Sequence, residues 1–229
     1  MSFLEIKGIK MHYGTGENSV DVLKGIDVSI EKGEICVLLG PSGSGKSTLL
    51  NIIGGIEDAD SGYIAIDGEK IEDMNEKKLT QYRRKHLGYV FQMYNLIPNL
   101  TVKENIEVGK YLGDNVLDID ELMKTLDIYD QRDKKPFQLS GGQQQRTSIG
   151  RAIVKNPDIL LCDEPTGALD YNNSKEILKL LEEINRRGTT VLVVTHNREI
   201  VNAMRKRVIT MKKGIIISDE EKGEYIDED

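Results

Sequence analysis

Residues 35–47 read Ile-Cys-Val-Leu-Leu-Gly-Pro-Ser-Gly-Ser-Gly-Lys-Ser, a short apolar run followed by a glycine-rich turn. The turn fits the pattern G-x-x-x-x-G-K-[ST] from Gly40 to Ser47, and the periodicity after it predicts a helix over Lys46–Ile53. Glycines let the backbone bend so that successive N–H groups point at one anion, and the helix adds its positive N-terminal end. A plain Gly/Ser turn is the alternative, but the flanking strand and helix favour a phosphate-binding loop.

Two side chains of this loop add the chemistry of a nucleoside triphosphate site. Lys46 supplies a mobile cation for the β- and γ-phosphates, and the Ser47 hydroxyl is a hard oxygen ligand suited to Mg²⁺. The residues assigned to this site are Gly40, Pro41, Ser42, Gly43, Ser44, Gly45, Lys46, Ser47 and Thr48.

The remaining pattern predicts an α/β fold. Strands buried on both faces are predicted at Ile35–Leu39, Ile159–Cys162 and Val191–Val194, with a weaker one at Leu87–Phe91. Alternating residues predict an antiparallel layer from Phe3–Met11, Ile26–Ile30 and Tyr63–Ile66. The predicted helices are Lys46–Ile53, Glu76–Lys85, Val102–Leu112, Ile119–Leu126, Gly141–Val154 and Asn173–Arg187. We therefore expect one domain over 1–229, with a core at 1–92 and 155–217, an inserted all-helical subdomain at 93–154 and an acidic tail at 218–229.

Composition excludes several classes of protein. Of the net charge of −7, residues 218–229 contribute −6, so the rest of the 229-residue chain has no basic excess for nucleic acid. The longest apolar run has five residues, against roughly 20 for a membrane span. Cys36 and Cys162 are too few for a disulfide framework or a four-cysteine zinc site. With no basic-then-apolar leader before Met11, we expect a cytoplasmic location.

Polar side chains follow three of the predicted strands. Asp163 and Glu164 follow Ile159–Cys162, His196 follows Val191–Val194 and Thr195, and Gln92 follows Leu87–Phe91. Each is unremarkable alone, and two adjacent acids can be a solvated turn. Ligands, however, bind at the carboxyl ends of parallel strands, beside the phosphate loop. We therefore expect Asp163 and Gln92 to hold Mg²⁺, Glu164 to polarise the attacking water and His196 to contact the γ-phosphate.

A second helix start exposes its backbone N–H groups but has no anion of its own. Ser140 and Gln143 fit the S-x-x-Q capping box, and Gly141 and Gly142 bare the first turn of the helix predicted at Gly141–Val154. A plain helix cap is the alternative. Each glycine costs about 1 kcal/mol against alanine inside a helix, which favours a place where an anion approaches the N–H groups closely.

Six stretches occur in the order and spacing of ATP-binding-cassette ATPases, which the chain resembles over about residues 3–217. They are Gly40–Ser47, Gln92, Leu139–Gln143, Ile159–Glu164, Ala168–Asp170 and His196. The resemblance implies a P-loop NTPase with a RecA-like parallel-sheet core that binds ATP and Mg²⁺. It makes Glu164 the catalytic base, His196 the γ-phosphate sensor, and Gln92 a metal and signalling contact.

In this family two copies pair head to tail. The resemblance implies that Ser140, Gly141, Gly142 and Gln143 of one copy cap the ATP on the loop of the other, with Ala168–Asp170 at the seam. It also places Tyr13 where an aromatic ring stacks on adenine, although a tyrosine after a strand can simply pack.

Within the family, the chain resembles the macrolide-exporter and lipoprotein-releasing branch, including bacitracin-type peptide-resistance transporters. Residues 88–97, 100–106 and 163–170 carry this resemblance. It implies an ATPase on the inner face of the membrane that drives a separate integral-membrane permease. The rivals are a soluble cassette protein of DNA maintenance or translation, and a non-hydrolysing switch that scaffolds its permease. Two departures from the family pattern are Cys162, where alanine is common, and Thr147–Gly150, which replaces an alanine-rich run.

Overall fold

The computed structural model describes residues 2–113, 115–197, 201, 202 and 204–222. The chain divides into two compact units: the first unit holds residues 1–80 and 192–229, and the second unit holds residues 81–191. The chain passes between the units inside helix α2 (Glu76–His86) and again inside strand β8 (Thr190–Thr195). No helix within the described residues is long and apolar enough to cross a bilayer.

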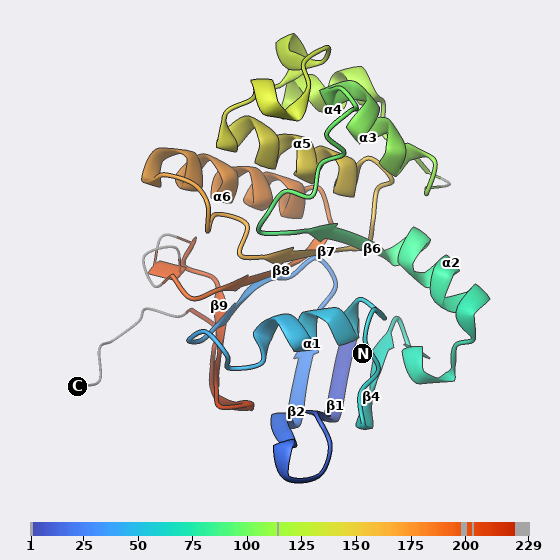
Figure 1. The fold of residues 1–229 in the computed structure, drawn as a ribbon, viewed down its shortest axis with the longest axis vertical. Coiled ribbons are helices and arrows are strands. Elements are labelled where there is room, and N and C mark those ends of the chain that lie inside the picture. Colours follow the sequence, from blue (N-terminus) through green and yellow to red (C-terminus); the bar gives the residue numbers. More distant parts are fainter. Residues whose placement is uncertain (1, 114, 198–200, 203, 223–229) are drawn as a thin grey trace. The chain divides into compact units, whose positions relative to one another are not determined.

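The first unit contains an antiparallel sheet with the strand order β2-β1-β4-β5 (Figure 1). Leu4 at the start of β1 pairs with both Ile30 and Ile66, and all three side chains are buried, which fixes the register. The predicted antiparallel layer is thus confirmed, with a longer second strand and an additional short one. The strands are β1 (Leu4–Tyr13), β2 (Val20–Ile30), β4 (Ser61–Ile66) and β5 (Glu69–Lys70).

The first unit also contains the strand that leads into the phosphate loop. All five residues of β3 (Ile35–Leu39) are buried, and helix α1 (Lys46–Ile53) follows the loop. The strand order here is β10-β9-β3-β8, with β9 (Arg207–Lys212) parallel to β3 and β10 (Ile215–Glu220) antiparallel to β9. Strands β9 and β10 were not predicted from the sequence. Residues 218–220, which were expected to belong to an acidic tail, are part of β10, and residues 223–229 lie outside the described residues.

The second unit pairs two parallel strands and carries most of the helices (Figure 1). Strand β6 (Leu87–Val90) runs parallel to β7 (Ile159–Asp163). As predicted, the described residues between 93 and 154 contain helices and no strand. The helices are α3 (Val102–Lys110), α4 (Ile119–Thr125), α5 (Gly141–Ile153) and α6 (Tyr171–Arg186). Short 3₁₀ turns lie at Gly16–Asn18, Ile71–Asp73, Tyr129–Gln131 and Pro136–Gln138.

Packing explains the glycine at position 150, which departs from the alanine-rich run of the family pattern. A β-carbon at Gly150 would lie 2.8 Å from Leu126 Cδ1 and 3.1 Å from Ile106 Cδ1, so alanine there would require these side chains to shift. The glycine therefore lets α3 and the end of α4 approach α5 closely, which offsets its cost in helix propensity.

The end of the described chain is held by an ion network around Arg207. Its guanidinium donates two 2.7 Å hydrogen bonds to the carboxylate of Asp219 in β10. It also donates to Glu34 at 3.0 Å and to the Ser29 carbonyl at 2.9 Å. The hydrogen bond from Arg207 lowers the pKa of Asp219. Because the Arg207 side chain is only 18% exposed, this bidentate pair is better shielded from water than an ordinary surface pair.

We expect Asp219→Asn to lower the free energy of unfolding at pH 7 by about 1 kcal/mol, the upper end of the range for partly exposed ion pairs. The Asp219 pKa is lowered on folding, so the contribution is complete above the usual carboxyl pKa of about 4 and is lost as the pH falls through the lowered value. The gap in urea midpoint between wild type and variant should therefore close in acid. Glu220→Gln makes the same charge change on the next, exposed residue and should leave the midpoint unchanged; an equal loss in both variants would contradict the assignment.

Candidate functional site

The glycine-rich loop of the first unit turns sharply between β3 and α1. Gly45 precedes α1 with a φ of +98°, a left-handed conformation that favours glycine, and a β-carbon there would lie 2.7 Å from Leu23 Cδ2. Gly40 is needed for a different reason, since a β-carbon would collide with the Met211 carbonyl of β9. Ser42, Gly43 and Ser47 are exposed along the loop.

The loop folds around the side chain of Lys46. Lys46 is 6% exposed, and its ammonium donates to the carbonyls of Gly40 at 2.8 Å and Pro41 at 2.9 Å. Main-chain carbonyls are neutral and only partly replace the hydration of a cation. A phosphate oxygen is a stronger partner for this buried charge, so the cation is well placed to bind an anion at the loop.

His196 lies beside this loop within the first unit. The Gly40 amide donates to the Thr195 carbonyl at 3.4 Å, which holds the end of β8 next to the loop. His196 and Gly40, Pro41 and Ser42 line one cavity of about 370 Å³. Lys212 also lines this cavity and adds a second cation that the sequence analysis missed.

Tyr13, at the end of β1, is anchored by its hydroxyl. The phenol donates to Glu57 at 2.5 Å and lies 3.5 Å from Thr48 Oγ1 of α1, while 43% of the residue is exposed. The hydrogen bond to the Glu57 carboxylate raises the pKa of the Tyr13 phenol. Glu57 itself accepts from Asn51 of α1 at 3.0 Å. The ring is therefore held beside the helix that follows the loop and keeps an open face.

In the second unit, two of the predicted strand-end residues follow neighbouring strands. Val90 of β6 pairs with Cys162 of β7, so Gln92 and Asp163 follow neighbouring strands at the same edge. A β-carbon at Gly167 would lie 3.0 Å from the Gln92 amide nitrogen, so this side chain lies against the turn after Asp163.

Glu164 begins that turn with a φ of +48°, an uncommon and strained conformation for a residue other than glycine. The amide of Gly167 donates to the Glu164 carbonyl at 3.0 Å and closes the turn. Strained backbone of this kind is concentrated at functional sites, which fits the assignment of Glu164 to chemistry. Cys162 is fully buried one residue before Asp163, and burial raises the pKa of its thiol.

The start of α5 forms the capping box that the sequence predicts. Ser140 Oγ accepts from the Gln143 amide at 3.3 Å, and Gln143 Oε1 accepts from the Ser140 amide at 3.0 Å. The two glycines also have packing reasons that the sequence analysis missed. A β-carbon at Gly142 would collide with Asn173 Oδ1, and one at Gly141 would lie 3.0 Å from the Tyr94 hydroxyl. The absence of side chains at Gly141 and Gly142 therefore also leaves room for Tyr94 and Asn173 of the second unit.

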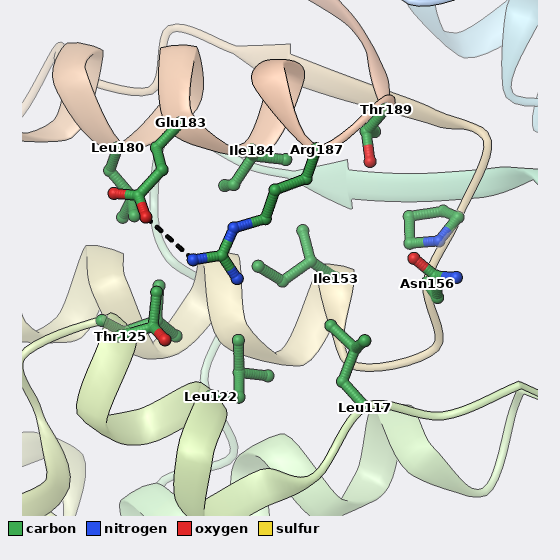
Figure 2. A pocket seen from close by; sticks show the side chains of 12 residues that line it. Leu117, Leu122, Thr125, Ile153, Asn156, Leu180, Glu183, Ile184, Arg187 and Thr189 are labelled. Atoms are coloured by element: carbon green, nitrogen blue, oxygen red, sulfur yellow. Dashed lines mark hydrogen bonds and ion pairs between the residues drawn. The ribbon is translucent and has the colours of Figure 1, made fainter.

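A separate cavity of about 250 Å³ lies among α4, α5 and α6 (Figure 2). Leu122, Ile153 and Ile184 contribute apolar surface to it, and Arg187 extends over it while donating to Glu183 at 2.8 Å. None of the predicted site residues lines this cavity.

The fold and the loop together define a P-loop NTPase of the ATP-binding-cassette type. The sequence profile described as "ABC transporter" matches residues 23–167, and this chain belongs to the ABC transporter family.

Relatives and solved structures agree with this family. The chain is 42% identical to the macrolide export ATP-binding/permease protein MacB of Mannheimia succiniciproducens, over 97% of this chain and 35% of that protein. It is 46% identical to the cell division ATP-binding protein FtsE of Bacillus subtilis, over 95% of this chain and 97% of that protein. It therefore spans about a third of the MacB relative but nearly all of FtsE. A dimeric structure of the ATP-binding cassette MJ0796, in a post-hydrolysis state with ADP and Pi, matches at 38% identity with a TM-score of 0.86, covering 97% of this chain and 100% of that one.

We expect the contact between Gly142 and Asn173 to appear in a double-mutant cycle. In an Asn173→Ala background, Gly142→Ala should stabilise the protein by up to about 1 kcal/mol, because alanine is the better helix former. With Asn173 present, the new β-carbon meets its amide, which the 2.5 Å bond to Asp170 holds in place, so this gain should vanish or reverse. Urea unfolding of the four proteins measures the coupling, and additivity within 0.3 kcal/mol would argue against the contact.

Proposed function

We propose that this chain binds ATP with Mg²⁺ at residues 40–48 and hydrolyses it as the motor subunit of a membrane transport complex. The observation that carries the proposal is the buried Lys46 ammonium, held inside a loop whose exposed rim leads into the start of α1. Membership of the family supports the same activity. The dimeric MJ0796 cassette, described with ADP and Pi, supports pairing of two copies around the nucleotide.

In this proposal the loop and its flanking residues bind and orient ATP. Backbone N–H groups at the start of α1 and the Lys46 ammonium hold the β- and γ-phosphates, and the Tyr13 ring stacks on adenine. His196 donates to the γ-phosphate from its place beside Gly40 and Ser42. Ser140–Gln143 of a second copy close over the same phosphates, with residues 168–170 of each copy at the seam.

The donor set fits Mg²⁺. Magnesium prefers oxygen ligands and is usually bound by one or two protein groups together with substrate phosphates and water. Within the described ranges no three His, Cys, Asp or Glu side chains gather as a metal site of their own. Ser47, Asp163 and Gln92 offer the few oxygen ligands that such a shared site needs. When bound, the ion neutralises charge that develops on the phosphates.

Glu164 acts as the general base. Its carboxylate takes a proton from the water that attacks the γ-phosphorus, the bond from that phosphorus to the β,γ-bridging oxygen breaks, and ADP and phosphate result. The strained turn holds Glu164 in one orientation, so less ordering is required when the reaction occurs.

We further propose that the motor drives a separate permease on the inner face of the membrane. Met93 and Ile97, which follow Gln92, are 73% and 39% exposed and suit an apolar contact with a cytoplasmic helix of the permease. Tyr94 and Leu96 are half-buried, and Tyr94 lies against Gly141, so these two contribute less. Similarity to MacB supports export of macrolides. Release of lipoproteins and export of antimicrobial peptides rest only on the resemblance of residues 88–97, 100–106 and 163–170 to that branch of the family.

A second candidate function is a part in cell division. The FtsE relative is 46% identical and matches this chain over nearly its whole length, as a cassette of similar size.

Co-purification from detergent-solubilised membranes separates the two candidates, because the permease recovered with the wild-type chain identifies the complex. A double variant, Met93→Ser with Ile97→Ser, should lose that permease, whereas Ile56→Ser, which changes another exposed apolar side chain, should keep it.

We expect Glu164→Gln to lower kcat for ATP hydrolysis by at least about 100-fold, the usual loss when a general base is removed. ATP binding should persist, and the ATP-bound dimer should accumulate in size-exclusion chromatography. Glu69→Gln, a change of the same kind on exposed β5, should have the wild-type rate. Equal turnover by wild type and Glu164→Gln would reject the base. Salt-dependent binding of nucleic acid, together with an ATPase rate that membranes do not change, would instead favour a soluble cassette protein.

A further inference from the structure

Gln145 of α5 joins the helix that begins at Ser140 to the turn that begins at Glu164. It is fully buried, and its Nε2 donates to the Pro165 carbonyl at 2.8 Å. Both residues belong to the second unit. Neither sequence reasoning nor the comparisons assign Gln145 a role.

The residue type is a poor choice for stability alone. Gln145 Oε1 is buried and accepts no hydrogen bond from the part of the chain that the structure describes. An unsatisfied buried acceptor is destabilising, whereas methionine has nearly the same shape and no such atom. A glutamine at this position therefore suggests that its one hydrogen bond has a use beyond packing.

That hydrogen bond acts on the strained part of the backbone. The Pro165 carbonyl belongs to the peptide group directly after the one that joins Glu164 to Pro165. Fixing its direction opposes relaxation of Glu164 from a φ of +48° toward the common regions. The Gly167 amide fixes the other side of the turn through the Glu164 carbonyl.

A second contact links the same two elements. Gly142, in the first turn of α5, lies against Asn173, which Asp170 holds by a hydrogen bond at the start of α6. Helix α5 thus contacts the segment 164–173 near both ends of that segment. Movement of the α5 start therefore changes the environment of Glu164 in the same chain.

We propose that Gln145 is a positioning residue that holds Glu164 in its reactive orientation and makes that orientation depend on the placement of the α5 start. This rests on the proposed function, in which Glu164 is the base and Ser140–Gln143 close over the nucleotide of a second copy. Closure of one nucleotide site would then be transmitted, through Gln145, to the base that acts at the other.

The wild-type chain is compared with three variants. Gln145→Met keeps the volume and removes the donor, so kcat should fall about 10- to 100-fold, with KM for ATP within about twofold. The melting temperature should stay close to that of wild type, because removal of the unsatisfied Oε1 offsets loss of the bond to the buried Pro165 carbonyl. Gln145→Glu keeps the shape but donates only when protonated, so its kcat relative to wild type should rise as the pH falls from 8 to 6. Ser148→Ala removes the other unpartnered buried atom of α5 and should have the wild-type kcat.

Each outcome decides the matter. A Gln145→Met variant that is slower but melts close to wild type, together with pH-dependent recovery of Gln145→Glu, supports the proposal. An unchanged kcat in Gln145→Met overturns it, as does a loss in Gln145→Glu that is the same at every pH. Wild-type turnover by Glu164→Gln would reject the base itself, whereas an inactive Glu164→Gln beside a fully active Gln145→Met rejects only the positioning role.

Discussion

Burial of the Lys46 ammonium is the constraint around which the first unit is arranged. The cation sits among main-chain carbonyls, so the loop must curl tightly, and only glycine fits at Gly40 and Gly45. The fully buried β3 delivers the loop, and β9 closes in behind it until its Met211 carbonyl lies against Gly40. Each of these features places a positive charge where water is scarce, and a charge in that setting interacts strongly with a bound phosphate.

Helix α5 has a comparable place in the second unit. It contacts the turn of Glu164 through Gln145, the start of α6 through Gly142, and the segment after Gln92 through Arg151, which donates to the carbonyls of Tyr94 and Asn95. Burial lowers the pKa of Arg151. One rigid helix thus joins the three segments to which the proposed mechanism assigns closure, catalysis and contact with the permease.

Local patterns predicted most of the fold, because their signals lie within a few residues of one another. The apolar run at Ile35–Leu39, the capping box at Ser140 and the periodicity before Gly188 all depend on near neighbours. Strand β9 was missed because its parallel partner β3 lies far away in the sequence. Strand β10 was missed although it pairs with the neighbouring β9 through close residues such as Ile215 and Lys212. Distant partners also explain why no pattern pointed to Glu57 or Gln145, whose hydrogen bonds span 44 and 20 residues. Lys212 was missed because only the fold brings it to the cavity beside the loop.

The left-handed backbone at Glu164 has an evolutionary consequence. Glycine or asparagine would adopt that conformation at lower energy, so selection for heat resistance alone would replace the carboxylate. A chain no longer under selection for function would be expected to acquire glycine or asparagine at position 164 early. The persistence of glutamate at this one strained position would then distinguish working copies of the gene from decaying ones.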